Sequence, residues 1–173
     1  MDKVNNKESG MKNFFRTMSL QCIDAIEIIL FIEKEGMGFY EKASRNVFDP
    51  KVRNMFLRLA DEERDHIQTL QTKIKFLQPA ISVKSKALER VDIFVKEELK
   101  GKIFPASEAE TVREYKSCAE ALEYGIESEK RSINILSQLL ENEKKLDVKT
   151  VFSHLIVEEK KHLALLEGLR KNI

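Results

Sequence analysis

Apolar residues recur every three or four positions along most of the chain, which is the spacing of amphipathic α-helices. A shorter stripe of the same kind occupies residues 85–100 and predicts a short helix. The pattern indicates an all-α protein with four long helices. These are predicted over residues 20–46, 50–77, 107–142 and 147–169.

Local signals predict where the long helices begin. Asp49 can cap the second helix, with Pro50 at its first position. Ser107 and Glu110 fit a capping box, so we expect the third helix to begin there. Asp147 is expected to cap the fourth helix. The short turns between the first and second helices, and between the third and fourth, predict two antiparallel hairpins.

The hairpins are joined by a connection of about 30 residues, which is longer than a simple up-down-up-down bundle needs. A segment of this length can travel the whole bundle, so that the second and third helices run parallel. We therefore predict a four-helix bundle built from two hairpins, with one long crossover that contains the short helix. Its apolar stripe would pack on the outside of the bundle or on a partner chain.

The two predicted hairpins repeat one another at a constant offset of 96 residues, with no gap across helix, turn and helix. Apolar stripe positions obey this offset, for example Phe56 and Phe152. Polar residues on the same stripes obey it too. The repeated polar pairs are Glu33 with Glu129, Glu63 with Glu159, and His66 with His162.

These polar residues are predicted to lie at one level of the bundle. Glu33 lies 15 residues before the turn near residue 48, and Glu63 lies 15 residues after it. At 1.5 Å per residue, both are about 22 Å from the turn on antiparallel helices. Glu129 and Glu159 match them in the second hairpin. Four Glu and two His would then meet in one core.

Four carboxylates buried together repel one another and are costly to desolvate, and no Lys or Arg shares their stripes at that level. Two divalent cations would balance the four charges, and neutral imidazoles would complete the ligand set. Such oxygen-rich sites suit iron or manganese. One Glu from each of two helices, with Glu-x-x-His from each of the others, is the ligand pattern of di-iron and di-manganese bundles. The alternative is ordinary core packing, in which case the metal-free protein would be as stable as the loaded one.

The chain resembles the rubrerythrin-type branch of the ferritin-like superfamily over residues 20–171, in a form that lacks the rubredoxin module. The stretches that carry the resemblance are "IEKEGMGFYEKA", "LADEERDHIQTL", "ALEYGIESEKRSI" and "IVEEKKHLALL". It implies a ferritin-like bundle that holds two iron ions, with manganese or a mixed pair as alternatives. It also implies terminal ligands Glu33 and Glu129, bridging ligands Glu63 and Glu159, and imidazole ligands His66 and His162.

The sequence departs from the family pattern at two places. Ser132 occupies the position of an additional glutamate that rubrerythrins often carry, which puts redox-linked ligand exchange in doubt. Leu136 or Ser137 replaces a frequent tyrosine two turns after the third-helix ligand. The first helix keeps Tyr40, which lies two turns after Glu33 and is a candidate to hydrogen-bond a ligand carboxylate from a facing helix.

Other polar residues near the site are expected to play no part in it. Glu62 and Glu158 each precede a predicted ligand, and one helical step turns them toward solvent. His154 lies off the stripe and is expected to be exposed. Cys22 and Cys118 are expected to be unpaired small apolar residues, roughly 30 Å apart on opposite sides of the site.

Composition narrows the classes of function. The 173 residues carry a formal net charge of +1, and no basic run has interleaved aromatics, so nucleic acid is not an expected partner. No apolar stretch is long enough to span a bilayer, and no secretory signal is evident, so a membrane role is not favoured and a cytoplasmic location is expected. We expect residues 1–18 to be a flexible lead and residues 19–173 to form the bundle.

The resemblance implies a non-haem di-iron oxidoreductase that reduces hydrogen peroxide. Its electrons would come from an external rubredoxin-like donor. Iron storage with ferroxidase activity is one alternative, and a di-iron monooxygenase acting with dioxygen is another. We expect a homodimer, in which helices exchanged between chains remain an open alternative.

Overall fold

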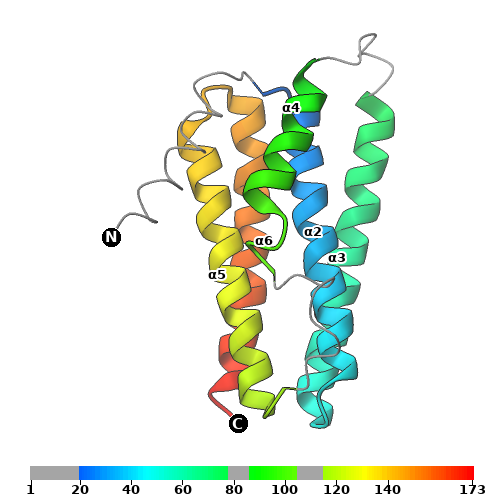
Figure 1. Ribbon diagram of the computed structural model, residues 1–173, viewed down its shortest axis with the longest axis vertical. Helices are drawn as coiled ribbons and strands as arrows, with labels where there is room; N and C mark the ends of the chain where they lie inside the picture. The colour runs from blue at the N-terminus through cyan, green and yellow to red at the C-terminus, as the bar shows by residue number, and fades with distance from the viewer. Residues whose placement is uncertain (1–19, 78–85, 105–114) are drawn as a thin grey trace.

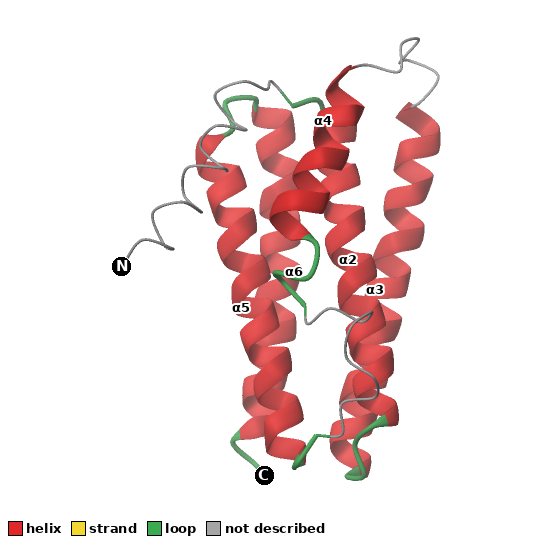
Figure 2. Ribbon diagram, in the orientation of Figure 1, coloured by secondary structure: helices red, strands yellow, loops and turns green. Residues whose placement is uncertain are grey.

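The computed structural model describes residues 20–77, 86–104 and 115–173, and within these ranges every regular element is helical (Figures 1 and 2). The predicted all-α class is confirmed. Two short elements lie between the second and third long helices. They are the α-helix α4 (Lys86–Phe94) and one π-helical turn, η2 (Val95–Leu99). The long helices are α2 (Cys22–Arg45), α3 (Pro50–Leu77), α5 (Cys118–Asn142) and α6 (Leu146–Arg170).

The long helices form the predicted ferritin-like arrangement. Helix α2 packs along α3 and α5 packs along α6, each pair as an antiparallel hairpin. Figure 1 shows that α3 and α5 run in the same direction, so the chain returns along the bundle between them. Helix α4 lies on this return path and packs against α2. Among the described residues, no helix is both long and apolar enough to cross a membrane.

The third long helix begins later than predicted. Helix α5 starts at Cys118, and Ser107 and Glu110 lie outside the described residues. The cap is a second Ser-x-x-Glu sequence ten residues further on. The Ser117 hydroxyl accepts a hydrogen bond from the Glu120 amide at 3.1 Å, and the Glu120 carboxylate accepts one from the Lys116 amide at 2.6 Å.

The two hairpin turns begin their second helices differently. Asp49 caps α3 as predicted, because its Oδ1 accepts hydrogen bonds from the amides of Lys51 (2.8 Å) and Val52 (3.1 Å). Asp147 was predicted to cap α6, and this is wrong, because α6 already begins at Leu146. Asp147 instead lies in the first turn, where a carboxylate suits the helix dipole, and accepts a hydrogen bond from the Cys22 thiol at 3.1 Å.

The crossover closes one side of the core. Leu99, Ile103 and Phe104 are buried, and the Arg131 guanidinium of α5 donates to the Ile103 carbonyl at 2.8 Å. Phe104 approaches α2 at Gly36, where an added methyl group would lie 3.1 Å from the ring. The crossover therefore packs on the bundle itself, which was one of the two expected positions for its apolar stripe.

Candidate metal centre

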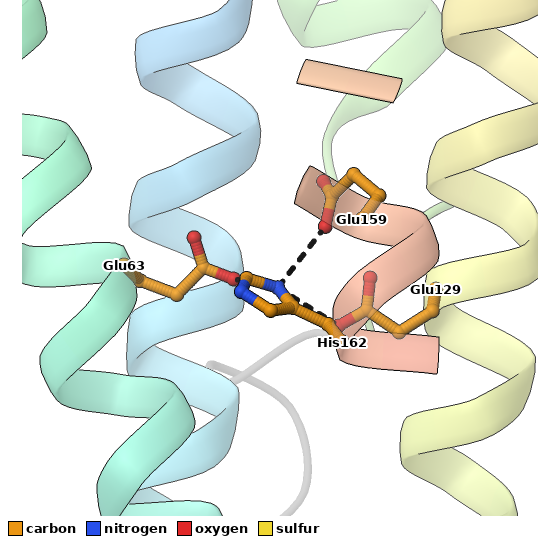
Figure 3. Close-up of side chains that lie close together, drawn as sticks. All are labelled: Glu63, Glu129, Glu159 and His162. Carbon is orange, nitrogen blue, oxygen red and sulfur yellow. Dashed lines mark ion pairs between the residues drawn. The ribbon is translucent and has the colours of Figure 1, made fainter. Parts of the chain in front are cut away.

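The fold brings all six predicted ligands into the middle of the bundle. Their ligand atoms form two groups, and within each group they lie within 4.8 Å of one another. The groups share Glu63, so they are parts of one centre. The first contains Glu33, Glu63 and His66, and the second contains Glu63, Glu129, Glu159 and His162. Figure 3 shows Glu63 and Glu129 reaching toward His162 from opposite sides.

Each carboxylate reaches the core because it occupies a stripe position that would otherwise be apolar. Each of the four long helices supplies one glutamate, and all four side chains are buried. The two imidazoles come from the Glu-x-x-His turns of α3 and α6, and their ring centroids lie 6.1 Å apart. The repeat in the sequence thus becomes an approximate two-fold repeat of donor atoms in space.

Several of these candidate metal-ligand atoms have no hydrogen-bond partner among the described residues. They include His162 Nδ1, which lies 3.3 Å from Glu63 Oε1 and 3.5 Å from Glu159 Oε2 without hydrogen-bond geometry. Buried polar atoms are almost always paired, so converging acceptor atoms without donors fit a site that binds cations. The others are Glu33 Oε1, Glu129 Oε2 and Glu159 Oε2.

The pKa shifts of the residues in the centre also fit a site that binds cations. Burial, with the nearby Glu33 carboxyl group, raises the pKa of Glu63 well above its usual value. Burial and the Glu159 carboxylate do the same for the pKa of Glu129. Burial lowers the pKa of His162, but the Glu159 and Glu129 carboxylates have a larger effect in the opposite direction. The pKa of His162 is therefore raised to about 9. The metal-free centre therefore holds protons that cations would displace.

Two hydroxyl groups hold ligand carboxylates in place. The Tyr40 hydroxyl donates to Glu129 Oε1 from the facing hairpin, which is the contact expected of it. The Ser132 hydroxyl donates to Glu159 Oε1 at 2.7 Å. Ser132 therefore occupies the place of the additional family glutamate as a hydrogen-bond donor to a ligand, and Leu136 occupies the position equivalent to Tyr40 as a fully buried apolar residue.

The expectation that Glu62 faces away from the site is wrong. Its Oε2 lies 3.3 Å from His162 Nε2, and its Oε1 lies 2.7 Å from the Arg58 guanidinium. The side chain is long enough to reach across to α6. A carboxylate at Nε2 favours the tautomer that leaves Nδ1 free to bind a metal. The signal in the sequence was that Glu62 and Glu158 obey the 96-residue offset.

The two imidazoles differ in their access to solvent. The His162 side chain is 2% exposed, whereas that of His66 is 30% exposed. The Glu33 carboxylate lies 3.3 Å from His66 Nδ1, and this contact raises the pKa of His66. Glu33 and His66 also line a pocket of about 190 Å³ between α2, α3 and α6. We therefore call the side of the centre around His66 the open half and the side around His162 the sealed half.

A bundle of this topology, with Glu from two helices and Glu-x-x-His from the other two facing one core, defines the ferritin-like class of carboxylate proteins. A family model described as Rubrerythrin matches residues 24–170. Because this match covers most of the chain, the protein belongs to the rubrerythrin family. No curated protein and no solved structure gives a significant match to it. The buried Glu and His cluster fits the di-metal site of this class.

Proposed function

We propose that this protein is a non-haem di-iron oxidoreductase that reduces hydrogen peroxide to water with electrons from a separate rubredoxin-like donor. The observation that carries the proposal is the pair of ligand groups that share Glu63, in which four buried ligand atoms have no hydrogen-bond partner among the described residues. Two ferrous ions held there would supply the two electrons that cleave an O–O bond. Family membership supports the same class of chemistry.

The surrounding residues would position the ligands and handle protons. Glu63 reaches both donor groups, which suits a bridging carboxylate. Glu62 would keep His162 in the tautomer that binds through Nδ1. Burial and the Glu129 carboxylate raise the pKa of Tyr40 well above its usual value, so its hydroxyl keeps its proton and stays a hydrogen-bond donor to Glu129.

The exposed half of the centre favours reaction with a small oxidant from solvent. His66 and Glu33 lie at the pocket, whereas His162 is buried beside Glu62 and Glu63 of α3. An oxidant would therefore approach from the His66 side. The electrons would arrive one at a time from the external donor after each turnover, and we expect the working unit to be a homodimer.

The test is rapid mixing of the anaerobic, iron-loaded protein with hydrogen peroxide and, separately, with dioxygen. The proposal expects oxidation by peroxide to be at least tenfold faster, with one peroxide consumed for each pair of ferrous ions. Equal rates with dioxygen would contradict it. Iron storage would instead appear as a large hollow assembly on size-exclusion chromatography that takes up many more than two irons per chain.

A further inference from the structure

The pocket beside Glu33 and His66, from which the oxidant would approach, is larger than hydrogen peroxide needs. It lies between the N-terminal half of α2, the C-terminal half of α3 and the first half of α6. Its inner wall is built from buried aliphatic side chains, namely Ile26, Ile29 and Leu155. Its outer part is lined by exposed polar side chains that include Thr69 and Lys73. It is therefore an apolar pocket with a polar mouth and two candidate metal ligands in its wall.

The equivalent region of the other half carries leucines at two positions where the pocket has polar side chains. The 96-residue offset places Leu165 where the open half has Thr69, and Leu169 where it has Lys73. Both leucines pack against the core. Leu166 also comes so close to α5 that a methyl group added at Gly125 would lie 3.2 Å from it. One fold thus fills this position on one side and leaves it open on the other.

The size of the pocket exceeds what hydrogen peroxide needs. An apolar cavity of about 150 Å³ accepts a molecule the size of benzene, whereas a water molecule occupies about 30 Å³ of liquid. A pocket of about 190 Å³ therefore suits roughly six to eight non-hydrogen atoms. Its aliphatic wall favours a hydrocarbon group, and Glu33 and His66 favour a polar group at the other end.

We infer that this pocket binds the hydrocarbon chain of an alkyl hydroperoxide and directs its peroxide group to the His66 side of the centre, an inference that rests on the proposed function. In the reaction the O–O bond breaks and the hydroperoxide gains two electrons and two protons. The products are the corresponding alcohol and water. A reduced metal pair held by the six ligands would supply the two electrons, and the external one-electron donor would replace them.

Binding is tested without any redox step, with 1-hexanol as the probe and zinc-loaded protein. Methyl NMR spectra are expected to show saturable shifts confined to pocket residues such as Ile29 and Leu155. The filled variant is T69L/K73L, which copies the leucines of the sealed half and should weaken binding at least tenfold. The matched control is Q68L/Q71L, which adds the same side chains to exposed positions of α3 outside the pocket and should change binding less than twofold.

Turnover is tested with hexyl hydroperoxide and hydrogen peroxide on the iron-loaded protein. The filled variant should lower kcat/KM for hexyl hydroperoxide at least tenfold more than kcat/KM for hydrogen peroxide. The inference is overturned if hexanol leaves the pocket methyl groups unshifted, if the filled variant binds it as well as the control, or if only hydrogen peroxide is reduced. If hexanol binds in the pocket but no peroxide is reduced, the proposed function fails as well, and binding alone survives.

Discussion

The two halves of the metal centre share their ligands but differ in what surrounds them. The half around His66 opens to the pocket, and that imidazole is 30% exposed. The half around His162 is enclosed, with Glu62 on the outer nitrogen of a ring that is 2% exposed. Duplication of a hairpin can thus preserve six ligand residues, while substitutions around them leave one side of the centre accessible to solvent and the other side buried.

The difference extends to the groups that hold the carboxylates. Ser132 donates a hydrogen bond to Glu159, and the equivalent position of the first hairpin is Gly36, where an added methyl group would lie 3.3 Å from Glu63 Oε1. Tyr40 donates to Glu129 in the sealed half, whereas Leu136 has no hydroxyl to offer Glu33. The sealed half therefore has more fixed donors around its ligands. In the open half, Glu33 contacts the His66 imidazole in place of a hydroxyl group.

The largest expected effect comes from removing the one carboxylate that both halves share. Glu63→Ala should abolish binding of both metal ions, because Glu63 belongs to both donor groups. Glu33→Ala should lose only the ion of the open half. Metal content per chain after anaerobic ferrous loading distinguishes them, with fewer than about 0.5 ions expected for the first variant and about one for the second.

A matched control for this pair is Glu62→Gln, which keeps every ligand and removes only the charge of the carboxylate that lies beside His162 and Arg58. It should still bind two ions, but the ion of the sealed half should bind about 10- to 100-fold more weakly. Circular dichroism checks that each variant keeps its helices. If Glu33→Ala and Glu63→Ala lose the same amount of metal, the two-group description of the centre is wrong.

The second prediction concerns the pH dependence of the metal-free protein. His162 has a folded-state pKa of about 9 against an ordinary value of 6.5. Its contribution to stability is therefore complete below about pH 6.5 and is lost as the pH rises through 9. For His162 alone this amounts to on the order of 3 kcal/mol. The raised pKa values of Glu63 and Glu129 act in the same direction.

Urea unfolding of the metal-free protein at pH 6.5, 8 and 9 measures this loss. Bound cations replace the protons, so the loaded protein should not lose stability over the same range. The variant His162→Gln should reduce the slope, and the part that remains belongs to Glu63 and Glu129. A metal-free protein that becomes more stable toward pH 9 would show that the sealed half does not retain its proton.

The third prediction tests the additional donor of the sealed half. Tyr40→Phe leaves Glu129 Oε1 without its hydroxyl partner in a fully buried position. The free energy of unfolding of the metal-free protein should fall by about 1–2 kcal/mol. Chemical denaturation measures it, with the unchanged chain as the reference. A free energy of unfolding that does not fall would mean that the Tyr40 hydroxyl does not support the site.

The sequence predicted the ligands well because one physical argument fixed them. Charged residues on an apolar stripe need a partner, and the 96-residue offset showed that Glu33 and Glu129, or His66 and His162, occupy equivalent positions. The same offset could have corrected the start of α5. Helix α2 begins at Cys22 and α5 at Cys118, with Gln21 and Ser117 before them. A local capping pattern at Ser107 was preferred to the repeat, and α5 begins later than this pattern predicted, at Cys118.

The open and sealed character of the two halves could not be predicted in this way. It depends on side chains such as Thr69 and Lys73, which lie off the stripe and have no fixed neighbour in a periodic pattern. Whether Glu62 reaches His162 depends on the rotamer of a long side chain and on the distance between α3 and α6. A helical repeat predicts the positions of the α-carbons. The opening of the pocket and the contact of Glu62 with His162 depend on side-chain conformations, which the repeat does not predict.

The smallest predicted effect concerns the beginnings of the two hairpins, which share a register but differ in cap chemistry. At the start of α5 the Ser117 hydroxyl accepts from the Glu120 amide. At the start of α2 the Gln21 amide donates to the Asp24 carboxylate at 2.7 Å. Ser117→Ala should lower the free energy of unfolding by about 1 kcal/mol, because it removes a side-chain cap. Ser153→Ala, which changes an exposed serine inside α6, is the control and should change it by less than about 0.5 kcal/mol. Thermal unfolding of both variants ranks them, and a loss from Ser117→Ala no larger than that from the control would show that the Ser117 cap does not define the start of α5.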